Sequence, residues 1–232
     1  MDETKRDVAG VGALADPIRY ELYRFVAAQA GPVSRDQAAD GLGIARHQAK
    51  FHLDKLEAEG LLECEYQRLS GRSGPGAGRT SKVYRRTRRE INVSLPQRQY
   101  ELASRLMAQA IVQSAQTGSR VREVLDRVAY EHGRRLAEGV QAAERIPQEG
   151  SGSDVAANVL RECGYEPRRV ADQLYLVNCP FRALADEQTE LICGMNLALI
   201  TGVTEVLTPH SPKPRLQPRP EHCCVVLAPT SD

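Results

Sequence analysis

The sequence PVSRDQAADGLGIARHQAKFHLDKLEAEGLL, residues 32–62, decides the fold of the N-terminal part of the chain. It predicts a short helix, a tight turn and a longer helix. Ser34 is placed to cap the first helix with its hydroxyl, and Asp36 adds a favourable charge near the helix N-terminus. Gly41 and Gly43 permit the sharp turn that follows.

The second helix is predicted to begin at Ile44. An apolar stripe at helical spacing follows, formed by Ala49, Leu53 and Leu56. His52, beside Leu53, is expected to be a packed, hydrogen-bonded histidine rather than a ligand. The polar side chains of this helix must then point away from the core: Arg46, His47, Lys50 and Asp54. Because recognition helices place their N-terminal residues against base edges in the DNA major groove, Arg46, His47 and Lys50 are the predicted base contacts.

Two extended segments, LLECEYQRL at 61–69 and SKVYRRT at 81–87, flank the glycine-rich sequence GRSGPGAGRT. This pattern predicts a hairpin with a long, basic tip. Between Tyr66 and Arg89 the chain has eight basic residues and no acidic one. We therefore predict phosphate contacts from this hairpin, made by Arg72, Arg79 and Lys82.

The charge of the whole chain hides this local bias, because 31 Lys and Arg stand against 30 Asp and Glu. Residues 1–90 contain 16 basic and 13 acidic side chains, whereas residues 151–232 contain 7 and 10. The N-terminal part is therefore the part expected to meet double-stranded DNA.

Three segments together resemble the ArsR-type winged-helix transcriptional regulators of bacteria: LADPIRYELYRFV at 14–26, FHLDKLEAEGLL at 51–62 and GRSGPGAGRTSKVYRR at 71–86. The resemblance is to the larger members, which have a C-terminal sensing domain. It implies that Asp16 caps a helix in which Pro17 takes the first position.

Two further segments, NCPF at 178–181 and ICGMN at 192–196, are similar to iron-sulfur-sensing repressors of iron-sulfur assembly genes. Those repressors usually have a further cysteine in the span that runs here from Cys193 to Cys223 without one. The resemblance therefore implies an iron-sulfur cluster and a repressor role, and it leaves the fourth ligand open.

The length and pattern predict an α+β protein in three parts: a winged helix-turn-helix domain at 1–90, a helical linker and dimerisation region at 91–148, and a mixed α/β sensor domain at 149–232. Residues 97–144 have apolar bands typical of two long helices. Such helices commonly pair across a two-fold axis, so we expect a homodimer on a palindromic operator; the alternative is that both fold back on their own chain. The segment 146–154 has the composition of a linker.

The sensor domain is predicted to contain a helix ending at Gly164, a strand pair turning at Ala171 and Asp172, a long helix over TELICGMNLALITGVTEV, and a final strand pair. No signal peptide and no run of eighteen apolar residues is present in the sequence, so we expect a cytoplasmic protein without a membrane partner.

Six cysteines in such a compartment are packed residues, redox thiols or metal ligands. Cys179 precedes a proline, Cys193 lies near a helix start beside Gly194, which would leave room for a large group, and Cys223 opens the last strand. Thiolates suit iron-sulfur clusters or zinc, so these three are the predicted ligands. Adjacent strand residues face opposite sides, which disfavours using both Cys223 and Cys224 unless the strand bulges. The possible fourth ligands are Cys224, Cys163, His210 or an outside group.

Two alternatives remain open. In one, the regulator responds to a small molecule or to zinc, and the cysteines are buried packing residues, as expected for Cys64 on the hairpin. In the other, the chain is a thiol-dependent redox enzyme, for which only Cys193 has a suitable position. The sequence contains no nucleotide-binding loop, no Ser-His-Asp order and no HExxH pattern, so we expect no enzyme.

Overall fold

A computed structural model describes residues 3–68, 80–143, 151–207, 211–219 and 222–229 of the chain. The fold is α+β, as predicted, and it divides into two compact units, Met1–Val93 and Ser94–Asp232, each with its own hydrophobic core. The two long helices predicted as a separate linker share their core with the C-terminal sheet, so they are part of the second unit.

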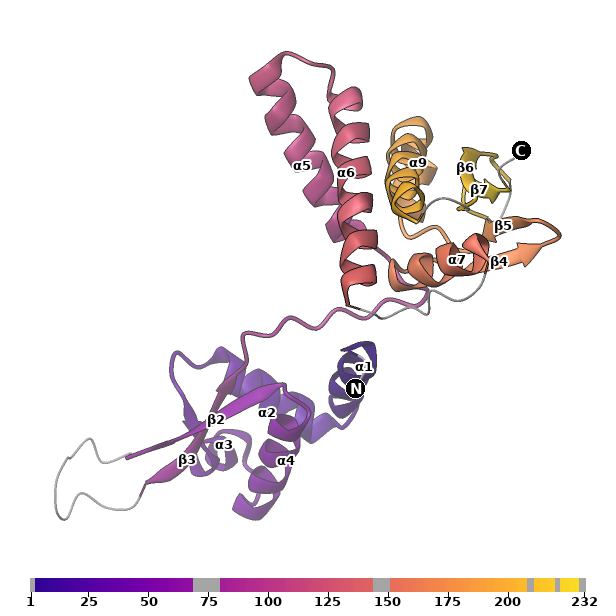
Figure 1. Ribbon diagram of the computed structural model, residues 1–232. Helices are drawn as coiled ribbons and strands as arrows, with labels where there is room; N and C mark the ends of the chain where they lie inside the picture. The colour runs from indigo at the N-terminus through magenta and orange to yellow at the C-terminus, as the bar shows by residue number, and fades with distance from the viewer. Residues whose placement is uncertain (1–2, 69–79, 144–150, 208–210, 220–221, 230–232) are drawn as a thin grey trace. The chain divides into compact units, whose positions relative to one another are not determined.

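The first unit combines helices with a small antiparallel sheet (Figure 1). Its elements are α1 (Glu3–Ala13), α2 (Pro17–Ala28), β1 (Val33–Ser34), α3 (Arg35–Leu42), α4 (Arg46–Ala58), β2 (Leu62–Gln67) and β3 (Ser81–Arg86). The sheet has the order β1-β3-β2. The predicted hairpin is confirmed, whereas α1 and the short strand β1 were not predicted. The apolar stripe of α4 is fully buried in the core.

Both predicted helix caps are present in this unit. The carboxylate of Asp16 accepts a hydrogen bond from the backbone N–H of Arg19 at 3.0 Å, and Pro17 opens α2. The hydroxyl of Ser34 accepts from the N–H of Gln37 at 3.2 Å, and the Gln37 side chain accepts from the N–H of Ser34 at 2.9 Å. This reciprocal pair satisfies two N–H groups that a helix terminus otherwise leaves without partners.

The turn between α3 and α4 differs in detail from the prediction. Gly43 has φ of 64° and ends α3, as expected for a residue in the left-handed region. Gly41 instead lies within α3, where a Cβ would overlap the ring of Phe25. Ile44 does not start the next helix; it packs at the edge of the core, and α4 begins at Arg46.

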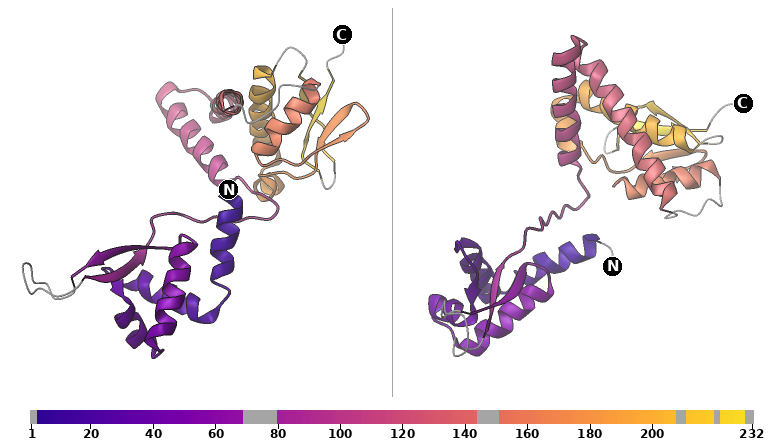
Figure 2. Two further views of the ribbon diagram at one scale, coloured as in Figure 1. Left: turned by 60° about the horizontal axis from the view of Figure 1, so that its bottom comes forward. Right: turned by 60° about the vertical axis from the view of Figure 1, so that its left-hand side comes forward.

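The second unit places helices against a four-stranded antiparallel sheet of order β4-β5-β7-β6. Its elements are α5 (Tyr100–Thr117), α6 (Val121–Ala142), α7 (Gly152–Glu162), β4 (Pro167–Val170), β5 (Gln173–Leu176), α8 (Arg182–Glu187), α9 (Thr189–Val206), β6 (Lys213–Leu216) and β7 (Val225–Ala228). The two long helices, the long helix α9 and both strand pairs are confirmed; α8 is an addition. Figures 1 and 2 show α9 beside α6.

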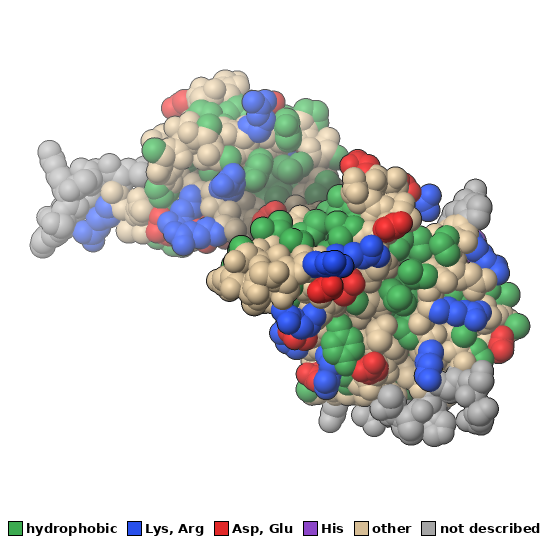
Figure 3. All heavy atoms as spheres, turned by 90° about the horizontal axis from the view of Figure 1, so that it is seen from above, with side chains coloured by type: hydrophobic (Ala, Val, Ile, Leu, Met, Phe, Trp, Pro, Cys, Tyr) green, Lys and Arg blue, Asp and Glu red, His purple; other side chains and the backbone are tan. Residues whose placement is uncertain are grey.

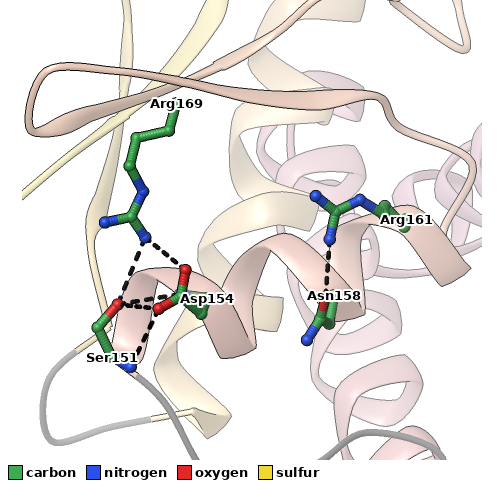
Figure 4. A network of polar contacts seen from close by, with 5 residues as sticks. All are labelled: Ser151, Asp154, Asn158, Arg161 and Arg169. Atoms are coloured by element: carbon green, nitrogen blue, oxygen red, sulfur yellow. Dashed lines mark hydrogen bonds and ion pairs between the residues drawn. The ribbon is translucent and has the colours of Figure 1, made fainter.

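The start of α7 fixes the edge of the sheet. Ser151 caps the helix, and its hydroxyl accepts from the N–H of Asp154 at 3.3 Å. Arg169 of β4 donates to the Asp154 carboxylate at 2.7 Å, so the cap also ties α7 to the first strand pair (Figure 4). Residues 146–150 of the predicted linker lie outside the described residues, and α7 begins within its remainder.

Helix α9 is long and apolar enough to cross a membrane by length and composition. Its buried residues, which include Ile192, Met195, Leu199 and Val203, lie in the core of the second unit, where the helix contacts α6, β6 and β7. We therefore interpret it as the central core helix of this unit.

The α6–α9 contact depends on two glycines. A Cβ on Gly133 would overlap the carbonyl group of Leu199, and a Cβ on Gly202 would overlap that of Tyr130. The two helices therefore meet backbone to backbone at this crossing. No side-chain rotation can relieve an overlap with a main-chain carbonyl.

We predict that Gly202→Ala destabilises the second unit by about 1–3 kcal/mol or more, because the added methyl forces the two helix backbones apart. The matched control is Gly139→Ala in α6, where a Cβ would meet nothing within 4 Å. This control should be neutral or stabilising by roughly 0.5–1 kcal/mol, since alanine favours helix. Urea unfolding of both variants measures the difference, and equal stability would contradict the backbone contact.

Candidate functional sites: the recognition helix and a cysteine cluster

The three predicted base-contacting side chains, Arg46, His47 and Lys50, are all exposed in the N-terminal half of α4. Buried residues on the opposite side hold the helix on the core, so this face is free to enter a groove. The guanidinium of Arg46, 61% exposed, donates to the Asp36 carboxylate at 2.9 Å. Asp36 thus contributes to the site by orienting Arg46, in addition to its charge near the start of α3.

The C-terminal half of α4 is connected to the hairpin by a polar network. The ammonium of Lys82 lies 2.8 Å from Asp54 and 2.5 Å from Glu57. The hydroxyl of Tyr84 donates to Asp54 at 2.6 Å, and the thiol of Cys64 donates to Glu57 at 2.8 Å. Asp54 therefore points away from the core, as predicted, and it binds the hairpin while 38% of its side chain stays exposed.

The contacts within this network favour the charged forms of Lys82, Asp54 and Glu57. Burial lowers the pKa of Lys82, but its bonds to Asp54 and Glu57 outweigh that effect and raise the pKa. The bond from Cys64 and that from Lys82 lower the pKa of Glu57. Lys82 is thus compensated by two carboxylates inside the unit, and we now expect it to brace the hairpin rather than to contact phosphate.

The remaining hairpin predictions have different outcomes. Arg72 and Arg79 lie outside the described residues, so their phosphate contacts stay predictions. Arg85 pairs with Glu63 across the strands at 2.8 Å. Arg86 and Arg88 are exposed near the base of the hairpin and add to its basic surface. His52 is half-buried against the Phe51 ring, and its Nδ1 has no partner among the described residues.

Four of the six cysteines meet in the second unit. Cys179 follows β5, Cys193 is the fifth residue of α9, and Cys223 and Cys224 directly precede β7. Cys179, Cys193 and Cys223 are buried and Cys224 is partly buried. Cys223 and Cys224 precede the strand, so strand alternation does not decide where their sulfurs point, and the two thiols contact different partners, Cys179 and Cys193. Whether one or both bind a ligand stays a prediction.

The four thiols form two pairs. The sulfurs of Cys193 and Cys224 are 2.7 Å apart. The Cys223 thiol donates to Cys179, which lowers the pKa of Cys179 to about 7 and raises that of Cys223. Burial, followed by the contact with Cys224, raises the pKa of Cys193 to about 12. The two pairs share one electrostatic environment, since Cys179 also acts on Cys193.

Buried amides and an arginine hold the segments that bear these cysteines. The Asn178 side chain accepts from the N–H of Glu166 at 2.6 Å and donates to the carbonyl of Gly164 at 2.9 Å. Arg98 donates to the carbonyl of Cys179 at 2.6 Å. The NCPF turn is therefore fixed from both sides before any ligand binds.

A second buried amide, Asn196, lies within the cluster itself. Its Nδ2 donates to the sulfur of Cys223 at 3.2 Å, and its Oδ1 accepts from the hydroxyl of Tyr165 at 2.5 Å. Neither Asn196 nor Tyr165 was predicted from the sequence as part of the site. Asn196 could have been noticed in the sequence as an amide within an otherwise apolar helix, because a buried amide requires hydrogen-bond partners.

The candidate fourth ligands are distinguished by position. Cys224 contacts Cys193, whereas Cys163 lies at the end of α7, where burial raises its pKa to about 12. His210 lies outside the described residues. Gly194 faces Asp126 and Arg122 of α6, so it does not make room at the cysteines, in contrast to the prediction. Among the described residues no group of three or more His, Cys, Asp or Glu is arranged to hold a metal ion.

A cavity of about 470 Å³ lies beside the cluster, between α5, α6 and the end of α7. Its lining includes Leu102, Leu106, His132, Cys163 and Tyr165. Burial lowers the pKa of His132, so this histidine presents a neutral ring. The volume and the mixed lining are compatible with a small molecule.

Comparison with known proteins identifies the first unit. Residues 14–65 match a family model described as a helix-turn-helix domain. The match begins just before α2, ends within β2, and includes both caps and the recognition helix. A search of curated proteins finds no match.

Together with the hairpin after α4, this match makes the first unit a winged helix-turn-helix domain. The chain is a DNA-binding transcriptional regulator, and its second unit is an α+β domain of helices and an antiparallel sheet.

We predict that Arg46→Ala weakens binding to a specific operator by about 1–3 kcal/mol and relaxes base preference at one position, because a bidentate contact to guanine is lost. Binding to random DNA should change little. Fluorescence anisotropy with both DNAs at fixed salt makes the comparison, and an equal loss on both would assign Arg46 to the backbone.

We predict that Lys82→Met lowers the stability of the first unit, on the order of 1 kcal/mol, and leaves the salt dependence of DNA binding unchanged. Because the pKa of Asp54 and that of Glu57 lie below their ordinary values of 3.8 and 4.5, this contribution is present above those values and is lost as the pH falls through the folded values. Unfolding at neutral and acidic pH measures the loss.

For comparison, replacing Arg72 and Arg79 should flatten the salt dependence by roughly one unit per lost phosphate contact. A reduced salt slope for Lys82→Met would instead restore Lys82 to the phosphate-contacting set.

Proposed function

We propose that this protein is a homodimeric, cytoplasmic winged-helix repressor whose second unit senses an intracellular signal through a cysteine-held iron-sulfur cluster. The observation that carries the proposal is the meeting of four cysteines from three separate segments in one buried region. Soft thiolates delivered from different segments are typical ligands of such clusters.

Thiolates are ligands of zinc as well as of iron-sulfur clusters, and we propose the cluster because the NCPF and ICGMN segments resemble those of iron-sulfur-sensing repressors. The thiols stand as two pairs, Cys179 with Cys223 and Cys193 with Cys224. We assign Cys179, Cys193 and Cys223 as ligands and Cys224, which contacts Cys193, as the fourth. When bound, an iron-sulfur cluster supplies a redox-active centre that oxidants destroy.

The DNA part of the proposal follows the geometry of α4. Arg46, His47 and Lys50 approach base edges, and the basic hairpin contacts phosphates on either side of them. A single recognition helix spans few base pairs, so two copies on a palindromic operator give the required site length.

The helices α5 and α6 supply the proposed dimer contact. Ile111 and Val112 of α5 are 58% and 55% exposed, and Val121 of α6 is 44% exposed. Figure 3 shows hydrophobic side chains among charged ones on one face of the molecule. Exposed apolar side chains on a paired-helix element favour a second copy of the same chain as the partner.

The cavity beside the cluster supports a second candidate function, in which a small molecule is the signal. Its lining includes Tyr165, which also contacts Asn196 of the cluster, so a ligand there would act on the same helix. In that case the cysteines would be buried packing residues.

We predict that anaerobically isolated protein is coloured and contains iron and acid-labile sulfide, because thiolate-to-iron charge transfer absorbs visible light. Single replacement of Cys179, Cys193 or Cys223 by serine should remove the colour. Operator affinity should differ about 5–150-fold between coloured and colourless protein, the usual range of coupling between two sites.

Cys64→Ser is the matched control, since this cysteine belongs to the first unit, and it should change neither colour nor affinity. Colourless, iron-free protein from iron-replete anaerobic cells, with wild-type operator affinity for Cys193→Ser, would remove the cluster from the proposal. The cavity would then be tested with ligand libraries by thermal shift.

A further inference from the structure

We propose that Asn196 is a positioning residue for the cluster site, which donates a hydrogen bond to the Cys223 sulfur and is itself oriented by Tyr165. The proposal rests on the function proposed above. Asn196 is the polar residue of the ICGMN segment, and the assignment of the cysteines as ligands leaves it without a role.

The three side chains form a continuous buried chain. Asn196 and Cys223 are each 1% exposed, and Tyr165 is 3% exposed. The Asn196 Nδ2 lies 3.2 Å from the Cys223 sulfur, and the Tyr165 hydroxyl lies 2.5 Å from the Asn196 Oδ1. Water has no access to replace either partner, so each bond contributes to the local structure.

The direction of these bonds follows from the chemistry of the groups. A ligating cysteine is deprotonated and only accepts hydrogen bonds, so the NH₂ of Asn196 must face the sulfur. The amide oxygen then faces Tyr165, whose hydroxyl donates. Tyr165 therefore prevents the amide from turning its oxygen toward the sulfur, an orientation that would repel a thiolate.

Helix α9 presents both functional groups on one face. Asn196 follows Cys193 by three residues, so their side chains are neighbours along the helix. One element thus delivers a ligand and the donor to a second ligand, Cys223, which comes from the bend before β7. A shift of α9 would change both contacts together.

A hydrogen bond to a ligating sulfur withdraws electron density from it. Such bonds are among the determinants of the reduction potential of iron-sulfur clusters, and they favour the reduced, more negative form. Residues that support metal ligands typically change metal affinity 10–100-fold when they are replaced. A purely structural amide would change only the stability of the fold.

The test uses the full chain, reconstituted anaerobically with ferrous iron and sulfide, as wild type, Asn196→Leu and Tyr165→Phe. The control is Thr204→Val, which removes another buried hydroxyl of α9 that donates to the carbonyl of Thr201 at 3.1 Å. Reductive titration followed by the visible spectrum gives the reduction potential. Bleaching by an iron chelator gives the rate of cluster loss.

We expect Asn196→Leu to make the potential more negative and to bleach roughly 10–100-fold faster than wild type. Tyr165→Phe should shift both quantities in the same direction by less, because the amide remains. Thr204→Val should keep the wild-type potential and bleaching rate while it lowers the stability of the fold.

A coloured Asn196→Leu with the wild-type potential and bleaching rate would overturn the role of Asn196 and leave the cluster in place. If Asn196→Leu does not fold, Tyr165→Phe decides, and wild-type values for that variant overturn the proposal. Colourless wild-type protein would overturn the proposed function and this inference together.

Discussion

The backbone contact between α6 and α9 is the constraint on which the second unit depends. Gly133 and Gly202 allow each helix to meet a main-chain carbonyl of the other, so neither helix can slide without repacking the core. The same α9 carries Cys193 and Asn196 beside the bend before β7. Under the proposed function, a movement of α9 at the cysteines would be passed to α6, and through it to the α5–α6 pair proposed as the dimer contact.

The recognition helix divides its length between two tasks. Its first half presents Arg46, His47 and Lys50 to solvent, and its second half is tied to β3 by Asp54 and Glu57 through Lys82. One ammonium thus faces two partly exposed carboxylates at this end of the helix. Because Lys82 holds the hairpin against α4, the orientation of the hairpin follows that of the recognition helix.

The sequence was sufficient wherever the cause of a structure is local. The caps by Asp16 and Ser34 were predictable because the groups that a cap satisfies lie within three residues. The role of Gly41 was not predictable, because a side chain at this position is excluded by the ring of Phe25, which lies on another helix. Lys82 was predicted to contact phosphate from local charge alone, whereas its partners are 25 and 28 residues away.

The cysteine site shows the same limit in a different form. Side chains alternate between the two faces only inside a strand, and Cys223 and Cys224 lie just before β7 begins. The ends of strands are the part that a sequence pattern predicts least well. Asn196 was recognisable as an amide in an apolar helix, and its burial without partners would be costly. Its partners, Tyr165 and Cys223, lie 31 and 27 residues from it in sequence. Only the packing of α9 in the folded unit brings these partners to Asn196. The sequence could therefore indicate that Asn196 is buried, but it could not show what Asn196 binds.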